Sequence, residues 1–261
     1  MNYLKTKNKI YSGGMIMKTI GVIPARYGSS RFPGKPLSDI CGKPMFWWVY
    51  QQALKADLDE VYVATDDERI LEAATQLNVR AIMTSKKHKT PNDRVWEVST
   101  KVEGDIFLCI NGDEPLIDPA VIKRALPEEN DKDDLEYYYS NIMTKVKNPV
   151  ELVDPTNIKA VANVKGEAMW ASRSAIPYPK GSMEFEYKKL VGIAAFSKKA
   201  LEFYHTTSRS KLEEAEELDL YRFLENGKKV KLKEIECDTL SVDTPKDLEH
   251  VRLAVAESLK K

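Results

Sequence analysis

Cysteine is scarce in this sequence. The chain has 261 residues and three cysteines, Cys41, Cys109 and Cys237. They lie far apart and no CxxC pair occurs, so we expect neither a disulfide framework nor a thiolate zinc site. The favoured interpretation is that all three are reduced thiols in a cytoplasmic protein.

Long apolar runs and an excess of charge are absent too. No run of 18 or more apolar residues occurs, so no membrane span is expected. The first 17 residues lack the apolar core and cleavage site of a signal peptide, and we interpret residues 1–17 as a flexible extension. Lys plus Arg total 40 and Asp plus Glu total 40, so the overall charge favours neither nucleic acid nor an anionic membrane as a partner.

Histidine is equally rare. His88, His205 and His250 are scattered and have no metal-ligand spacing. No Ser/His/Asp or Cys/His arrangement is evident, and each histidine is interpreted as a surface or structural residue.

The first 125 residues do carry a clear pattern, in which short apolar runs alternate with amphipathic segments. It predicts strands at 18–24, 60–64, 80–83 and 105–110, and helices at 44–56, 67–77, 92–101 and 119–126. Such alternation indicates an α/β fold, with a mainly parallel mixed sheet and helices on both faces. Ligands of these sheets bind beyond the carboxyl ends of the strands.

The second half has a different pattern. We expect a charged linker or loop at 128–134, and β segments, some of them antiparallel, at 158–164, 169–172, 191–197 and 229–235. One charged amphipathic helix is predicted at 211–226 and a terminal helix at 245–259.

A cationic loop follows the first predicted strand, over residues 24–36. It contains Arg26, Arg31 and Lys35 among small residues, a combination that suits phosphate groups. The loop matches neither GxxxxGK[ST] nor GxGxxG. A solvated basic loop remains an alternative interpretation.

Carboxylates stand at two other places. Asp113 and Glu114 follow the buried strand at 105–110, where they suit Mg²⁺ but also a simple turn. Asp243 precedes the last helix, where a capping role is the local alternative. If Asp113 and Asp243 meet in space, phosphate cradling and a two-carboxylate metal site would favour phosphoryl or nucleotidyl transfer.

Six motifs occur in an order that resembles a known family: IPARYGSSRFPGKP, CGKPM, VATD, NGDEP, SRSAIP and VDTPKDLE. The family is that of the 3-deoxy-manno-octulosonate cytidylyltransferases, or CMP-Kdo synthetases. The resemblance runs from about Lys18 to the C-terminus. It implies a Rossmann-like nucleotidyltransferase domain over 18–261, with a smaller β-rich dimerisation lobe within about 135–200.

The resemblance also implies an activity and a set of functional residues. The family couples CTP to an acidic sugar with Mg²⁺, releases pyrophosphate and forms homodimers. Positions that match its motifs are expected to bind the nucleotide (Pro24, Ala25, Arg26, Lys35, Asp66, Arg94 and Asp113), to catalyse (Arg26, Lys35 and Asp113), to hold Mg²⁺ (Asp113 and Asp243) and to bind the sugar (Asn111, Glu114, Leu190 and Asp219). Ser172 and Arg173 would lie in the dimer-forming segment.

The departures from the family pattern gather on the sugar side. Leu190 stands where the family has a histidine, Asn111 where it has glutamine, Pro91 where it has glycine, and Asp219-Leu220 where it has Glu-Gln. Leucine cannot donate the hydrogen bond of a histidine, a loss of about 1–3 kcal/mol. The sequence therefore suggests a Kdo-like acceptor that differs from Kdo itself.

Three alternatives stay open. One is an acceptor from the nonulosonic, sialic-type acids. A non-catalytic nucleotide-binding homologue would be expected to lack one of Lys35, Asp113 or Asp243, and all three are present. A polyanion-binding protein is disfavoured by the zero net charge.

Overall fold

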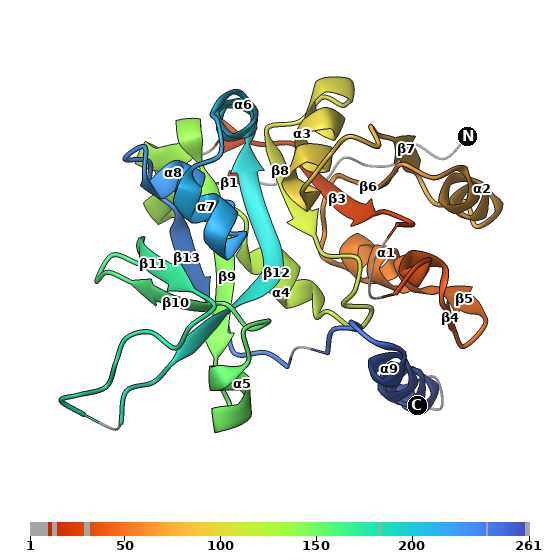
Figure 1. The fold of residues 1–261 in the computed structure, drawn as a ribbon. Coiled ribbons are helices and arrows are strands. Elements are labelled where there is room, and N and C mark those ends of the chain that lie inside the picture. The colour runs from red at the N-terminus through yellow and green to blue at the C-terminus, as the bar shows by residue number, and fades with distance from the viewer. Residues whose placement is uncertain (1–9, 12–14, 29–31, 183, 239, 259–261) are drawn as a thin grey trace.

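A mixed β-sheet runs through the middle of the protein, with helices against both of its faces (Figure 1). The structure is a computed structural model that describes residues 10–11, 15–28, 32–182, 184–238 and 240–258. Within these residues the large sheet has nine strands, in the order β11-β10-β12-β8-β3-β6-β7. Off this path, β9 pairs with β12, and β13 pairs with β9.

The first half of the chain supplies the parallel part of the sheet. Its strands are β3 (Thr19–Ala25), β6 (Glu60–Thr65), β7 (Ala81–Met83) and β8 (Ile106–Ile110). β3 lies between β6 and β8 and is parallel to both. Every residue of β8 is buried, as expected for a parallel strand covered on both faces. The predicted strands are confirmed, with ends shifted by one residue.

The second half adds strands that are mostly antiparallel to their neighbours, as predicted, although its last strand pairs in parallel. Its strands are β9 (Tyr139–Lys145), β10 (Lys159–Ala162), β11 (Ala168–Ser172), β12 (Lys188–Ser197) and β13 (Lys231–Glu234). β12 is the link: it pairs with β8 at its end and with β9 along most of its length. The strands of the predicted smaller lobe therefore continue the sheet of the first half.

Helices cover both faces, which confirms the predicted α/β arrangement. On one face α1 (Met45–Lys55), α2 (Glu68–Gln76) and α4 (Pro119–Arg124) form one apolar core with the sheet. On the other, α3 (Pro91–Lys101), α6 (Lys198–Thr206) and α8 (Leu220–Leu224) form a second core. No helix in the described part of the chain is long and apolar enough to cross a membrane.

Two predicted elements were wrong. The expected loop at 128–134 forms a 3-10 helix, η2 (Glu129–Tyr137), whose first turn carries a capping box. The single helix expected at 211–226 is divided into α7 (Lys211–Glu216) and α8, because Glu217 adopts a left-handed backbone with φ 53°. The pattern also missed β9, α5 (Pro149–Val153) and α6.

The C-terminal helix α9 (Pro245–Ser258) packs against residues that are distant from it in sequence. Its apolar residues form a third core with the hairpin of β4 (Asp39–Ile40) and β5 (Lys43–Pro44), which follows the short helix η1 (Lys35–Leu37). Val242, just before α9, is fully buried in this core. The start of α9 is thereby held beside the loop that follows β3.

At the N-terminus, β1 (Ile10–Tyr11) and β2 (Met15–Ile16) pair as a two-stranded antiparallel sheet. The other residues of the predicted extension up to Gly14 lie outside the described part of the chain, so its flexibility stays a prediction. Arg31 of the cationic loop and Leu259 of the terminal helix lie outside it as well.

Candidate active site

A cavity of about 230 Å³ lies beyond the carboxyl ends of β3 and β8, where ligands of parallel sheets bind. We call it the cation-rich cavity. Its lining residues are Pro24, Arg26, Lys35, Pro36, His88, Lys89, Thr90, Pro91, Arg94, Asn111, Gly112, Asp113 and Asp243. Four lysine and arginine side chains around two carboxylates suit a polyphosphate bound with a divalent cation.

Lys35 joins the two predicted metal ligands. Its Nζ lies 3.0 Å from Oδ2 of Asp113 and 3.8 Å from Oδ1 of Asp243, and it donates a hydrogen bond of 2.8 Å to the Val242 carbonyl. The Val242 N–H in turn donates to the Asp113 carbonyl. Asp113 and Asp243, separated by 130 residues in sequence, are thus neighbours in space, which was the condition set by the sequence.

Glycine is required where the two strand ends meet. A Cβ on Gly112 would lie 2.9 Å from the Pro24 carbonyl oxygen, closer than real Cβ contacts. The lack of a side chain lets the loop after β8 pass directly over the end of β3. Asp113, the next residue, therefore lies close to the cationic loop.

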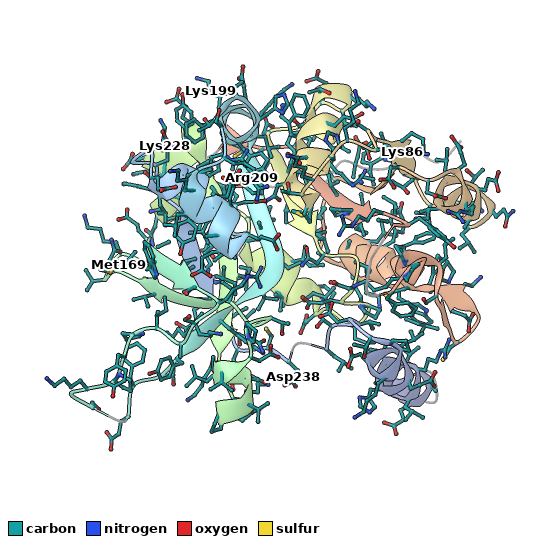
Figure 2. The ribbon with its side chains drawn as sticks, viewed as in Figure 1. Lys86, Met169, Lys199, Arg209, Lys228 and Asp238 are labelled. Atoms are coloured by element: carbon teal, nitrogen blue, oxygen red, sulfur yellow. The ribbon has the colours of Figure 1, made fainter. Side chains whose placement is uncertain are left out.

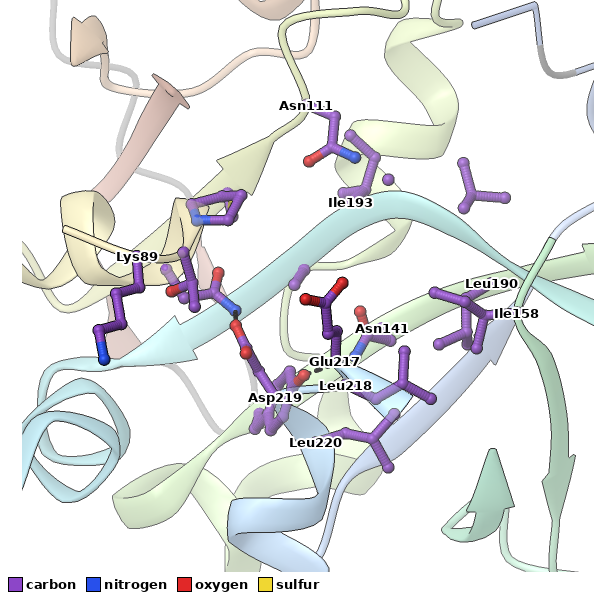
Figure 3. Close-up of a pocket in the computed structure, with 18 of the residues that line it drawn as sticks. Lys89, Asn111, Asn141, Ile158, Leu190, Ile193, Glu217, Leu218, Asp219 and Leu220 are labelled. Atoms are coloured by element: carbon purple, nitrogen blue, oxygen red, sulfur yellow. Dashed lines mark hydrogen bonds between the residues drawn. The ribbon is translucent and has the colours of Figure 1, made fainter. Parts of the chain in front are cut away.

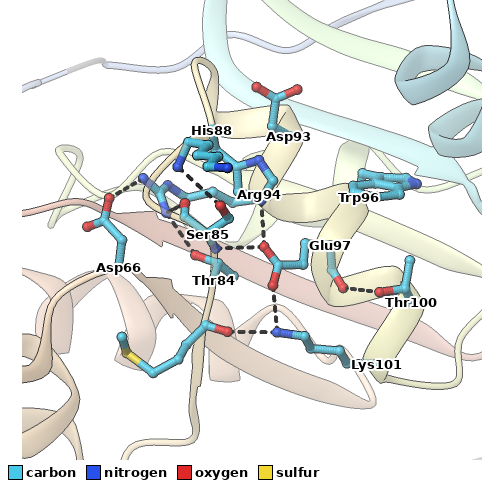
Figure 4. A network of polar contacts seen from close by, with 12 residues as sticks. Asp66, Thr84, Ser85, His88, Asp93, Arg94, Trp96, Glu97, Thr100 and Lys101 are labelled. Atoms are coloured by element: carbon cyan, nitrogen blue, oxygen red, sulfur yellow. Dashed lines mark hydrogen bonds and ion pairs between the residues drawn. The ribbon is translucent and has the colours of Figure 1, made fainter.

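Arg94 is fixed within the wall of the cation-rich cavity (Figure 4). Its Nη2 lies 2.6 Å from Oδ2 of Asp66, and its Nη1 donates to the Thr84 hydroxyl and to the Ser85 carbonyl. The side chain of Arg94 is only 4% exposed. Asp66 does not line the cavity itself, so its place in the site is behind Arg94.

A larger cavity of about 600 Å³ adjoins the first (Figure 3). We call it the acceptor cavity. Residues shared by both cavities are Arg26, Lys89, Thr90, Pro91 and Asn111. The others are Asn92, Cys109, Tyr139, Asn141, Ile158, Leu190, Val191, Gly192, Ile193, Ala194, Arg209, Glu217, Leu218, Asp219 and Leu220. The shared wall means that ligands in the two cavities would lie side by side.

Asn111 and Glu114 both meet the backbone of Gly192 on β12. The Asn111 N–H donates to the Gly192 carbonyl, and a Cβ on Gly192 would collide with the Asn111 side chain. The Gly192 N–H donates to Oε1 of Glu114 over 3.3 Å, while Oε2 of Glu114 has no partner among the described residues. Burial, helped by the Asp113 carboxylate, raises the pKa of Glu114 to about 7.

Asp219 stands at the break between α7 and α8. Its Oδ2 accepts hydrogen bonds from Asn92 at 2.8 Å and from the Tyr204 hydroxyl at 3.2 Å. The Tyr204 hydroxyl also shares a 2.6 Å hydrogen bond with Thr90, which lines both cavities. Burial, with the Glu213 carboxylate nearby, raises the pKa of Asp219 to about 6. The helix break thus puts a carboxylate of unusual basicity into the acceptor cavity.

One wall of the acceptor cavity is apolar. Leu190 and Ile158 lie next to each other, and Leu218 and Leu220 lie across from them (Figure 3). Leu190 is partly exposed, while Leu218 and Leu220 are buried. Leu190, which stands where the family has a histidine, therefore lines this cavity.

The predicted site residues separate into two groups. Lining one or both cavities are Pro24, Arg26, Lys35, Arg94, Asn111, Asp113, Leu190, Asp219 and Asp243. Ala25, Asp66 and Glu114 line neither, and they contact or adjoin residues that do. Ser172 and Arg173 bind Glu216 at the end of α7.

Sequence reasoning missed several lining residues. His88, interpreted as a surface or structural residue, lines the cation-rich cavity together with Lys89 and Thr90. Asn141 and Arg209 line the acceptor cavity. Polar residues cluster just before the helix at 92–101, and this pattern could have pointed to His88, Lys89 and Thr90. No local pattern marks Asn141, which lies on the missed strand β9.

A sheet of this topology, with a cation-lined cavity at its strand ends, is the arrangement expected of a nucleotidyltransferase, and the comparisons with known proteins show that class. The family model described as "Cytidylyltransferase" matches residues 20–230. The chain is 40% identical to the 3-deoxy-manno-octulosonate cytidylyltransferase of Escherichia coli over 93% of this chain and 98% of that protein. It is 41% identical to that of Solibacter usitatus over 91% and 94%. The chain therefore belongs to the cytidylyltransferases, in the family of 3-deoxy-manno-octulosonate cytidylyltransferases.

Solved structures agree. CMP:2-keto-3-deoxy-manno-octonic acid synthetase complexed with CTP superimposes with a TM-score of 0.85 at 40% identity, over 92% of this chain and 99% of that one. The inositol-1-phosphate CTP transferase of T. maritima has a TM-score of 0.64 at 16% identity, over 92% and 97%, a likeness that concerns the fold alone. The resemblance seen in the sequence motifs is confirmed.

Proposed function

We propose that this cytidylyltransferase joins CTP to Kdo or a Kdo-like acidic sugar, giving the CMP-sugar and pyrophosphate. The observation that carries the proposal is Lys35, whose ammonium lies between Asp113 and Asp243 in the cation-rich cavity, which shares a wall with the acceptor cavity. A relative at 40% identity that was solved with CTP supports the choice of nucleotide.

The two carboxylates beside Lys35, those of Asp113 and Asp243, are suitable ligands for Mg²⁺. Hard oxygen ligands are what Mg²⁺ prefers, and it commonly binds through one or two carboxylates plus substrate phosphates. Among the described residues, no group of three or more His, Cys, Asp and Glu side chains is arranged to hold a metal. Asp113 and Asp243 would therefore hold the ion together with the nucleotide. When bound, Mg²⁺ neutralises charge on the phosphates and polarises their oxygens.

The residues of the two cavities then act on different parts of the reaction. Arg26, Lys35 and Arg94 bind the triphosphate and stabilise the charge that develops on it. The acceptor hydroxyl attacks the α-phosphorus, the bond from that phosphorus to the pyrophosphate oxygen breaks, and the hydroxyl proton passes to solvent. Asn111 and Arg26, which line both cavities, are placed to orient the two substrates toward each other.

The test is pyrophosphate release in the presence of Mg²⁺. CTP, UTP, ATP and GTP are each paired with acidic sugars that include Kdo and sialic-type acids. We expect release with CTP and an ulosonic acid, and loss of release on chelation that added Mg²⁺ restores. A folded protein that binds CTP but releases no pyrophosphate with any acid would favour the non-catalytic alternative.

A second acceptor candidate is favoured by one observation, the apolar wall around Leu190 and Ile158. A hydroxyl placed against that wall loses its water without gaining a partner, which costs about 1–3 kcal/mol. We therefore propose that the preferred acceptor carries a deoxy or acylated carbon at this position. Equal kcat/KM values for Kdo and for such analogues would contradict this preference. We expect Leu190→His to shift the ratio toward Kdo by about tenfold.

We also propose a homodimer, as the resemblance implies. The edge strand β11 exposes Met169 and Trp170, and the segment between β11 and β12 exposes Tyr178 and Phe185 (Figure 2 shows Met169 at this edge). Large apolar side chains exposed at a sheet edge are of the kind that association surfaces contain. Sedimentation of the parent and of Met169→Glu tests the assignment.

We place the enzyme in the cytoplasm, since its free cysteines suit a reducing compartment.

A further inference from the structure

Tyr204, on α6, lies behind the wall of the acceptor cavity with its side chain fully buried. It lines neither cavity, and no motif of the sequence marks it. Its hydroxyl oxygen lies 3.2 Å from Oδ2 of Asp219 and 2.6 Å from the Thr90 hydroxyl oxygen. Asp219 lines the acceptor cavity (Figure 3), and Thr90 lines both cavities. We call Thr90, Tyr204 and Asp219 the tyrosine bridge.

The direction of each hydrogen bond in the tyrosine bridge is set by the groups around it. Burial raises the pKa of Tyr204, so its hydroxyl keeps its proton. An ionised Asp219 can only accept, so Tyr204 donates to Oδ2, as does the amide of Asn92. The Thr90 oxygen accepts from the Asp93 N–H at 3.1 Å, which leaves the proton of Thr90 for Tyr204. Oδ2 of Asp219 is therefore held by two donors.

The ring of Tyr204 is held from its other side. The Arg222 guanidinium lies 3.9 Å from the centroid of the ring, and its Nη1 donates to the Tyr204 carbonyl. Arg222, on α8, also pairs with the fully buried Glu213 of α7, with 2.9 Å between Nε and Oε2. The two helices on either side of the break that carries Asp219 are thus fastened at the same tyrosine. The Tyr204 hydroxyl is fixed in place by these contacts.

We propose that Tyr204 is a positioning residue for the acceptor, because its hydroxyl holds the Asp219 carboxylate at a fixed place in the acceptor cavity. This inference rests on the proposed function, since it needs Asp219 to contact the acceptor. Oδ1 of Asp219 has no hydrogen-bond partner in the described part of the chain, so it can accept from a hydroxyl or amino group of a bound sugar. A carboxylate that is already oriented loses less conformational freedom when the sugar binds.

Tyr204→Phe removes one oxygen atom and keeps the packed ring. We expect kcat/KM for the acceptor to fall by about tenfold, because the Asp219 side chain is no longer held. The dissociation constant for CTP should stay within about twofold of the parent value. Tyr204 does not line the cation-rich cavity, and the capping box of Thr90 with Asp93 remains. A general loss of structure would weaken CTP binding as well.

The experiment measures pyrophosphate release at pH 8, where Asp219 is ionised, with CTP, Mg²⁺ and Kdo or whichever acid of the panel the parent uses fastest. CTP affinity is measured separately by calorimetry without a sugar. The variants are Tyr204→Phe, Asp219→Ala and the double variant. Tyr138→Phe is the matched control, because that buried hydroxyl donates over 2.7 Å to the Ala125 carbonyl and Tyr138 lines neither cavity.

A double-mutant cycle shows whether Tyr204 acts through Asp219. We expect Asp219→Ala to lose at least as much kcat/KM as Tyr204→Phe, and the double variant to lose no more than Asp219→Ala. Additive losses, or a value for Tyr204→Phe equal to that of Tyr138→Phe, overturn the inference. If the parent releases no pyrophosphate with any acid, the proposed function has failed instead, which is a separate result.

Circular dichroism and the unfolding midpoint show whether Tyr204→Phe is folded. If it is not, the same cycle with Asp219→Ala is run on Thr90→Val, which removes the other hydroxyl of the tyrosine bridge, and on Thr90→Ser, which keeps it. We expect Thr90→Val to lower kcat/KM for the acceptor by about fivefold or more only when Asp219 is present, and Thr90→Ser to match the parent. Equal values for the two Thr90 variants contradict the inference.

Discussion

The two cavities are assembled in different ways. The cation-rich cavity takes most of its charged groups from loops at the ends of parallel strands, and Lys35 pairs there with Asp113 and Asp243, while Arg94 pairs with Asp66 behind the wall. The acceptor cavity is bounded by the long strand β12 and by the break between α7 and α8, and it combines an apolar wall with a carboxylate of raised pKa. From this difference we infer that the transfer chemistry depends on charged groups held by the strand ends, while acceptor choice depends on the side chains that line the second cavity.

The largest effect that separates the two cavities is expected from Asp113→Asn. This change removes a charge from the proposed metal site and leaves Lys35 with one carboxylate fewer. We expect kcat/KM for pyrophosphate release to fall by about 100- to 1,000-fold. Asp238→Asn is the matched control, because that side chain is 95% exposed and pairs with Lys147 on the surface. Activity of Asp113→Asn close to that of the control would remove Asp113 from the chemistry.

A second test concerns how firmly these charged groups are held. Arg94→Ala leaves the Asp66 carboxylate, only 16% exposed, without its charged partner. Breaking such a pair from one side costs about 3–5 kcal/mol in the free energy of unfolding, measured by denaturant titration. Arg69→Ala breaks the surface pair with Asp67, where the arginine is 56% exposed, and should cost far less. Equal losses in the two variants would mean that the pair behind the wall is no stronger than a surface pair.

Gly192→Ala is expected to act on the acceptor cavity alone. The added methyl group collides with the Asn111 side chain, which must move. We expect the KM for the acceptor to rise by about tenfold, while the dissociation constant for CTP stays within about twofold of the parent value. Gly181→Ala serves as the control, because a Cβ there meets nothing within 4 Å. A matching loss of CTP affinity would show that the two cavities are not separable at Asn111.

The smallest effect is one of pH on stability. The pKa of Asp219 is raised to about 6 in the folded state from an ordinary value of 3.8, so its ionised form destabilises the fold above pH 6. Asp219→Asn keeps an oxygen for the Asn92 and Tyr204 donors without the charge.

We therefore expect Asp219→Asn to be more stable than the parent by about 1 kcal/mol at pH 8, and this advantage to disappear toward pH 4. Denaturant titrations at the two pH values measure it. An advantage that does not change with pH would mean that Asp219 does not titrate in this range. Activity measured alongside would show what the destabilising carboxylate contributes to acceptor binding.

The cation-rich cavity was largely predictable from sequence, for a physical reason. Strand ends in a parallel sheet lie at one edge, so residues directly after apolar runs, such as Arg26 and Asp113, are neighbours whatever lies between them. Resemblance to a known family supplied Asp243 and Arg94, which local patterns leave ambiguous. The burial of Val242 in the core around α9, which brings Asp243 to Lys35, has no local signal.

The acceptor cavity was less accessible to prediction. Asn141 lies on β9, whose sequence YSNIMTK has too little alternation to indicate a strand, although all but its last residue are buried. Glu217 has a left-handed backbone that glycine or asparagine would have signalled, so a continuous helix was expected across the point where Asp219 enters the cavity. Leu190 was singled out from the family pattern, and only the fold shows that it faces an open space.

The position of α9 determines when the candidate site is completed as the chain folds. Asp243 reaches its position beside Lys35 only when α9 docks on the hairpin of β4 and β5, which lies more than 200 residues earlier in the chain. A nascent chain that has already formed its parallel strands therefore still lacks one of the two carboxylates at Lys35. The grouping of Lys35, Asp113 and Asp243 is therefore complete only after α9 has docked, and we expect chains truncated before α9 to lose this grouping.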